Sequence, residues 1–224
     1  MYANRDPSSG TLKEFLDKGI FLPLEMEGKD RQSFLCRLGV PDAEHITLND
    51  ITKFGFMISD IVLYENDYAI IKGQNIIYDL KGIPRARIFE ITLSHIKNFV
   101  SARHGLPARI KCITILNVPP IMVPVLEKIR MLLGQKLGNM MRLCPEGNLE
   151  ELYKHVPISL IPKQYGGEAC INEIVDHWKQ KMEEYKDWFL EDAIFCTDET
   201  KRIEDKFSDD YFGVDGSFRK LELD

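Results

Sequence analysis

The sequence lacks the short motifs that mark most enzyme active sites. No GxGxxG, GxxxxGK[ST], GxSxG or HExxH motif occurs in its 224 residues. Ser94 and His95 are neighbours, but adjacent side chains on a helix point apart, so they do not form a nucleophile–base pair. We therefore assign no catalytic residue and expect that the protein is not an enzyme.

Paired cysteines and long apolar runs are also missing. The five cysteines are scattered without a CxxC pair, which is typical of reduced intracellular thiols. The histidines show no ligand spacing, so we expect no metal and no cofactor. No segment resembles a signal peptide or is apolar for long enough to span a bilayer. The sequence thus predicts a cytoplasmic protein that contacts membranes only peripherally.

Net positive charge is absent as well. The formal net charge of −6 argues against a general nucleic-acid binder, whose affinity would depend on a cationic surface. The apolar fraction of 44% is ordinary for a globular protein and is sufficient for a sizeable core.

The apolar pattern alternates between the two periods of secondary structure. Segments with β-branched runs or extended character predict strands at 20–24, 33–38, 75–80, 112–116 and 140–143. Segments with helical spacing predict helices at 11–16, 48–64, 88–100, 121–133, 149–155 and 170–190. Gly134–Gly138 is interpreted as a breaker region. This alternation favours an α/β fold with a mostly parallel sheet.

One stretch, residues 109–133, combines three of these features. A β-branched run ends at Asn117, two prolines forbid further strand pairing, and an amphipathic helix follows. Its apolar positions are Met122, Val125, Leu126, Ile129, Leu132 and Leu133. From periodicity alone, this could be an ordinary β–α unit that packs its helix on a sheet.

Several motifs in order make residues 31–167 resemble the CRAL-TRIO (Sec14-like) lipid-binding domain family. They are similar in style to insect proteins related to alpha-tocopherol transfer protein and clavesin, which often end like GSFRKLELD (216–224). The motifs that carry the resemblance are SFLCRLG (33–39), NIIYDLKG (75–82), ITILNVPPIM (113–122), NLEELYKHVP (148–157) and LIPKQYGG (160–167).

The resemblance implies a carrier with a SpoIIAA-like α/β fold, in which a sheet forms the floor of an apolar cavity. The helix after the proline corner would act as a movable gate, and the cargo would be a small hydrophobic lipid such as a tocopherol or retinoid. By family position, the residues expected to line this cavity are Ile88, Ile91, Ile113, Ile115, Val125, Ile129 and Leu132. For each of them, core packing unrelated to a cargo is the alternative.

The resemblance also implies a phosphoinositide site. Arg109, Lys111 and Lys136 match basic residues that some family members use for phosphoinositide headgroups, and clustered cations attract phosphates. Two further basic positions of that pattern are Gly138 and Met140 here. The three cations could instead be ordinary solvated side chains.

By the same resemblance, residues 1–30 would be the remnant of a linker that follows an N-terminal helical domain. Residues 31–190 would be the lipid-binding domain, and residues 191–224 a charged tail. Two other functions remain open: a membrane-recruitment or interaction module without cargo, and an α/β enzyme with an unrecognised site.

Overall fold

The structure, a computed structural model, describes residues 5–24, 31–192 and 194–195, apart from the side chains of Leu93 and His104. The chain divides into a compact unit, Met1–Ile194, and a second unit, Phe195–Asp224, of which only Phe195 is described. Most of the predicted charged tail therefore lies outside the described residues.

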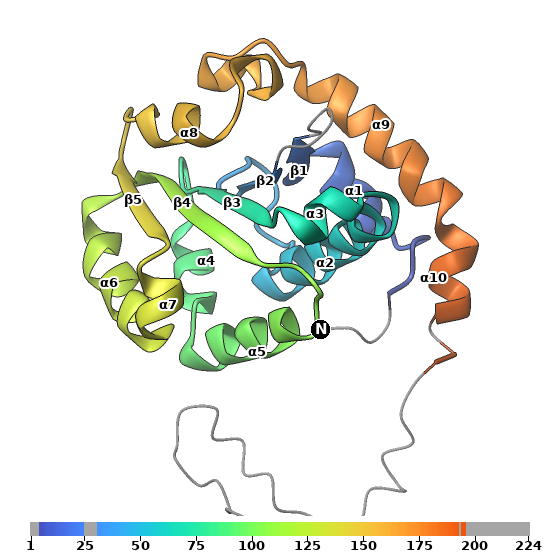
Figure 1. Ribbon diagram of the computed structural model, residues 1–224, viewed down its shortest axis with the longest axis horizontal. Coiled ribbons are helices and arrows are strands. Elements are labelled where there is room, and N and C mark those ends of the chain that lie inside the picture. The colour runs from blue at the N-terminus through green and yellow to red at the C-terminus, as the bar shows by residue number, and fades with distance from the viewer. Residues whose placement is uncertain (1–4, 25–30, 193, 196–224) are drawn as a thin grey trace, which may run out of the picture. The chain divides into compact units, whose positions relative to one another are not determined.

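Within the described residues, five strands form one sheet in the order β1-β2-β3-β4-β5 (Figure 1). β1 pairs antiparallel with β2, and the other neighbouring pairs are parallel, as the alternation of strands and helices predicts. Parallel strands buried on both faces require apolar side chains on both sides, which explains their β-branched runs. The strands are β1 (Phe21–Leu24), β2 (Gln32–Arg37), β3 (Gln74–Asp79), β4 (Ile110–Val118) and β5 (Met141–Pro145).

Helices cover both faces of this sheet (Figure 1). Thr47 caps the longest of them in a capping box with Asp50, which satisfies amide donors at the start of the helix. The α-helices in the described residues are α1 (Gly10–Asp17), α2 (Leu48–Glu65), α3 (Asp67–Ile71), α4 (Arg85–Glu90), α5 (Leu93–His104), α6 (Val123–Leu132), α7 (Gly134–Gly138), α8 (Glu150–His155), α9 (Ile171–Glu184) and α10 (Lys186–Asp192).

The two faces of the sheet are packed differently. On one face, Leu35, Ile77 and Leu116 form a closed core with Leu152 of α8 and Val175 of α9. On the other face, the alternate residues of the same strands point toward α2, α5 and α6, with more space between the layers. The second face therefore carries the candidate site.

Two predicted helices are broken in the structure. The prediction of one helix over residues 88–100 is wrong, because Ile91 leaves the helical region and Thr92 caps a new helix by accepting a hydrogen bond from His95 N. The predicted helix over residues 170–190 divides at Tyr185 into α9 and α10. At Thr92, the capping hydrogen bond starts a new helix even though the apolar pattern of the sequence continues through this position.

Two further differences concern short helices. Gly134–Gly138, interpreted as a breaker region, forms the one-turn helix α7, and Gly134 has a positive φ of 73° at its start. The sequence does not predict α3, because this helix has only five residues after its Asn66 cap and is too short to show a helical period. Although residues 1–30 were assigned to a linker, α1 and β1 pack in the same compact unit as the rest of the sheet.

Gly39 holds the end of β2 close to the end of β3. A Cβ atom at this position would lie 1.9 Å from the carbonyl oxygen of Lys81. We expect Gly39→Ala to lower the free energy of unfolding by about 1–3 kcal/mol, because backbone would have to move on both sides. Urea unfolding followed by circular dichroism measures this change.

Gly10 provides the matched control, since a Cβ atom there meets no atom within 4 Å. Gly10→Ala should leave the unfolding midpoint unchanged or raise it slightly. Equal midpoints for the two variants would contradict the close approach at Gly39.

Candidate functional site

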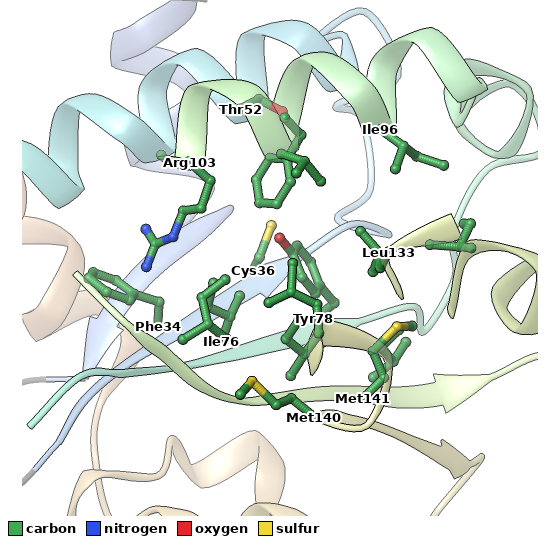
Figure 2. A pocket seen from close by; sticks show the side chains of 18 of the residues that line it. Phe34, Cys36, Thr52, Ile76, Tyr78, Ile96, Arg103, Leu133, Met140 and Met141 are labelled. Carbon is green, nitrogen blue, oxygen red and sulfur yellow. The ribbon is translucent and has the colours of Figure 1, made fainter. Parts of the chain in front are cut away.

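A cavity of about 730 Å³ lies between the second face of the sheet and the helices above it. This volume falls in the range of about 300–1,000 Å³ that is typical of small-molecule sites. The lining side chains come from strands of the sheet below and from α2 and α5 above (Figure 2), and α6 and α7 contribute further lining residues.

The floor of the cavity follows from the period of two along the strands. Phe34 and Cys36 on β2, Ile76 and Tyr78 on β3, and Ile113 on β4 are alternate residues that face the same side. Their neighbours in the sequence face the closed core instead. One sheet therefore supplies both a solid core and an apolar floor.

The roof of the cavity combines aromatic and aliphatic side chains from different helices. Phe56 of α2 stacks on Phe99 of α5, with ring centroids 5.9 Å apart and planes inclined by 24°. Leu126 and Ile129 of α6 contribute the wall beside them, together with Met122 from the turn before α6. The roof is thus built from segments far apart in the chain.

The structure brings four of the seven predicted cavity residues together at this cavity: Ile91, Ile113, Ile115 and Ile129. The other three, Ile88, Val125 and Leu132, are not among the lining residues. On α6 the lining positions are Met122, Leu126, Ile129 and Leu133, so the helix is rotated by about one residue relative to the prediction. Whether any of these side chains contacts a lipid stays a prediction.

The outward side of the same region is also apolar. Ile121 is 79% exposed and Met131 of α6 is 73% exposed. Phe89 of α4 is 80% exposed. α6 therefore has apolar side chains both toward the cavity and toward solvent, a pattern that one-sided packing on a core does not require.

The corner before α6 is held by a hydrogen-bond network that is buried where Tyr165 meets Asp79. Asn117 has a positive φ of 53°, which asparagine tolerates better than most residues. Its Nδ2 donates to Asp79 Oδ1 at 2.7 Å, and its Oδ1 accepts from Gly147 N at 3.2 Å. The Tyr165 hydroxyl donates to Asp79 Oδ2 at 2.5 Å, and burial followed by the Asp79 charge raises the pKa of this tyrosine. These hydrogen bonds fix the position of Asn117, where the chain turns from β4 toward α6.

The three predicted phosphoinositide residues are among the residues that line the cavity. Arg109, Lys111 and Lys136 are all exposed. A β-bulge explains why the consecutive residues Ile110 and Lys111 of β4 both line the cavity, because Ile110 and Cys112 pair with Gln74 and Asn75 and leave Lys111 between them. Gly73, with a φ of 84°, leaves room for the Lys111 stem. Whether the cations bind a phosphoinositide stays a prediction.

Sequence reasoning missed the polar groups inside the cavity. Arg103 of α5 and Tyr78 of β3 line it, and so does the Cys36 thiol. Burial raises the pKa of Cys36 to about 12, so the thiol is neutral at physiological pH. Burial also raises the pKa of Tyr78. The signal for Arg103 was its spacing from Ile96 and Phe99, which places a cation on the buried face of α5.

An apolar cavity with few polar groups defines a class of protein that binds a hydrophobic small molecule. The model of the CRAL/TRIO domain family matches residues 16–167, and the chain belongs to this family of lipid-binding and transfer proteins. Proteins of this family are lipid binders and carriers, and in general they are not enzymes. Their ligands are lipids rather than cofactors.

Curated relatives and a solved structure are similar to parts of the chain. The alpha-tocopherol transfer protein-like proteins of Pongo abelii, Homo sapiens and Mus musculus are each 29% identical over 114 residues, which is 48% of this chain and 31% of each relative. The match thus covers about a third of the length of these relatives. The crystal structure of Sfh5 aligns with a TM-score of 0.48 and 13% identity over 67% of this chain and 56% of that chain.

Among the described residues, no helix is both long enough and apolar enough to cross a membrane. The same residues contain no group of three or more His, Cys, Asp or Glu side chains placed to hold a metal ion.

Substitutions of Asn117 test whether its backbone conformation and its hydrogen bonds stabilise the corner before α6. Asn117→Ala should lower the free energy of unfolding by about 1–3 kcal/mol, because alanine is strained at positive φ and leaves Asp79 without one hydrogen bond. Asn117→Gly removes the same hydrogen bonds but fits the backbone, so its loss should be smaller. Thermal unfolding of both variants separates the two effects, and equal losses would contradict the role of the backbone conformation.

Proposed function

We propose that this protein binds one small hydrophobic lipid in the cavity and transfers it between membranes. Tocopherols, retinoids and related lipids are the class that fits, and the protein would act in the cytoplasm with transient contact at membrane surfaces. The observation that carries the proposal is the cavity of about 730 Å³ with its largely apolar floor and roof.

The energetics support a carrier of this kind. Each methylene moved from water into an apolar site contributes about 0.8 kcal/mol, so ten methylenes contribute about 8 kcal/mol before the cost of association is subtracted. Such a lipid would be held in solution but would still partition into a bilayer when the cavity opens there. Release then requires one wall to move, and α6 is the candidate because it follows the Asn117 corner and has apolar side chains on both sides.

Docking on a membrane is the second part of the proposal. Ile121, Met131 and Phe89 offer exposed apolar contacts. Arg109, Lys111 and Lys136 offer cations that anionic headgroups attract. Together these groups support a docking surface at which a phosphoinositide assists the opening of the cavity.

A membrane-recruitment module without cargo is the alternative function. The exposed cations favour it, since they would bind an anionic surface whether or not a lipid is carried. The alternative predicts vesicle binding without saturable uptake of any apolar ligand, whereas the carrier proposal predicts both.

The role of α6 in cargo binding can be tested with a pair of substitutions on the same helix. Ile129→Asp should weaken binding of tritiated tocopherol or retinol at least tenfold, because it places a carboxylate in an apolar wall. Met131→Asp adds the same charge on the exposed side and should leave equilibrium binding unchanged while it slows transfer to vesicles. Gel filtration with labelled lipid measures binding, and circular dichroism confirms that both variants fold.

Unchanged binding in the Ile129→Asp variant would show that α6 does not line the cargo site. If the wild-type protein takes up no tocopherol, retinol or other apolar lipid in a saturable way, the carrier proposal fails.

The docking proposal predicts a dependence on cationic side chains and on salt. Replacing Arg109, Lys111 and Lys136 with glutamine should weaken binding to vesicles that contain phosphatidylinositol bisphosphate by roughly 100-fold, at about 1 kcal/mol for each cation. Binding should also fall as ionic strength rises. Sedimentation with vesicles of phosphatidylcholine, with and without the phosphoinositide, measures both effects.

Lys163→Gln is the control, since Lys163 is exposed but lies outside the cavity lining. An equal loss of binding in this variant would show that net charge, rather than the three lining cations, attracts the vesicles.

A further inference from the structure

We propose that the cargo is a lipid with a neutral hydroxyl or carbonyl oxygen, which accepts a hydrogen bond from the Tyr78 hydroxyl on the floor of the cavity. A pure hydrocarbon of the same shape lacks this contact. This inference rests on the proposed lipid-binding function and specifies which chemical group of the lipid the cavity recognises.

The position of Tyr78 is the first observation. Tyr78 lies on β3, an interior strand of the sheet, and its side chain lines the cavity. The residue is only half-buried although helices cover this face of the sheet, so its accessible part faces the cavity. Figure 2 shows its hydroxyl oxygen beside the Cys36 sulfur, pointing from the sheet toward the helices above.

The Tyr78 hydroxyl has no hydrogen-bond partner among the described residues. By contrast, the Tyr165 hydroxyl donates to Asp79 and the Tyr185 hydroxyl donates to Glu65. A phenol O–H enclosed by apolar side chains costs free energy unless an acceptor compensates the lost water. The Tyr78 hydroxyl is therefore available to a bound lipid.

The other two hydroxyl groups of the described cavity lining are used within their own helix, α2. Thr52 donates to the Leu48 carbonyl and Ser59 donates to the Gly55 carbonyl, both at 2.8 Å. Both bonds close one helical turn, as is usual for hydroxyls inside helices. Among these three hydroxyl groups, Tyr78 is thus the donor that remains for a cargo.

The surroundings of the Tyr78 hydroxyl suit a neutral oxygen. Cys36 of β2 and Ile115 of β4 pair with Tyr78, so a thiol and an aliphatic side chain flank the ring. The charge of Arg103 also acts on Tyr78, but this guanidinium already donates to Gln74. Burial raises the pKa of Tyr78, so the hydroxyl keeps its proton and acts as a donor. One neutral donor compensates a hydroxyl or carbonyl oxygen, but it does not offset the desolvation of a charged headgroup.

Tyr78→Phe tests the inference, because it removes the hydroxyl and keeps the ring. Oleyl alcohol and cis-9-octadecene share a flexible carbon chain, and only the alcohol carries an oxygen. The substitution should weaken binding of oleyl alcohol by about threefold to tenfold and should not weaken binding of the hydrocarbon. Displacement of a tritiated lipid from the delipidated full chain measures both affinities. Unchanged binding of oleyl alcohol, or an equal loss for both ligands, would overturn the inference and leave the carrier function intact.

Tyr68→Phe is the matched control, since Tyr68 belongs to α3 and lies outside the cavity lining. This variant should keep both affinities. Because the Tyr78 hydroxyl has no partner in the protein, Tyr78→Phe should not lower the thermal unfolding midpoint of the lipid-free chain. A lower midpoint would show that the hydroxyl bonds within the protein, and it would overturn the inference.

Oleate separates a neutral from a charged headgroup. If Tyr78→Phe weakens binding of oleate more than binding of oleyl alcohol, the hydroxyl recognises a charged headgroup and the proposal is wrong. If the wild-type protein binds neither oleyl alcohol nor cis-9-octadecene and also takes up no tocopherol or retinol, the proposed function fails and this inference fails with it.

Discussion

An apolar cavity of this size imposes the main physical constraint on the molecule. The side chains around about 730 Å³ of space lack the packing contacts that a closed core would give them, and such a loss of contacts lowers the net stability of a domain. Walls dominated by apolar side chains favour an apolar occupant over water. The walls must also be held apart by contacts that do not pass through the cavity.

Buried polar contacts at the edges of the cavity provide this support. The Arg87 guanidinium of α4 is 1% exposed and donates to three backbone carbonyls, those of Leu38, Ala43 and Ile46, at 2.6–2.8 Å. These bonds fasten α4 to the loop that follows β2. At the end of β3, Asp79 accepts a hydrogen bond from Asn117 and so fixes the corner that precedes α6. α6 is thus anchored at its beginning through the Asn117 corner, and Arg130 in its last turn donates to the Met141 carbonyl of β5.

The sequence allows the α/β class, the five strands and the apolar character of α6 to be predicted, because periods of two and 3.6 are properties of local sequence. The failures have a different origin. The break at Thr92 depends on a single hydroxyl that caps α5, and the continuous apolar pattern around it conceals the cap. The rotation of α6, which brings Leu126 and Leu133 to the cavity in place of Val125 and Leu132, is set by packing against distant strands. Arg103 was missed because only the fold reveals that its helix face borders a cavity.

The most direct test of this account is a native mass spectrum of the full chain after purification from a lipid-containing source. We predict a one-to-one complex with a lipid, which organic extraction removes and which leaves the mass of the chain alone. A spectrum that shows only the unliganded chain, from a protein that also takes up no lipid when apolar and acidic lipids are added, would contradict the account.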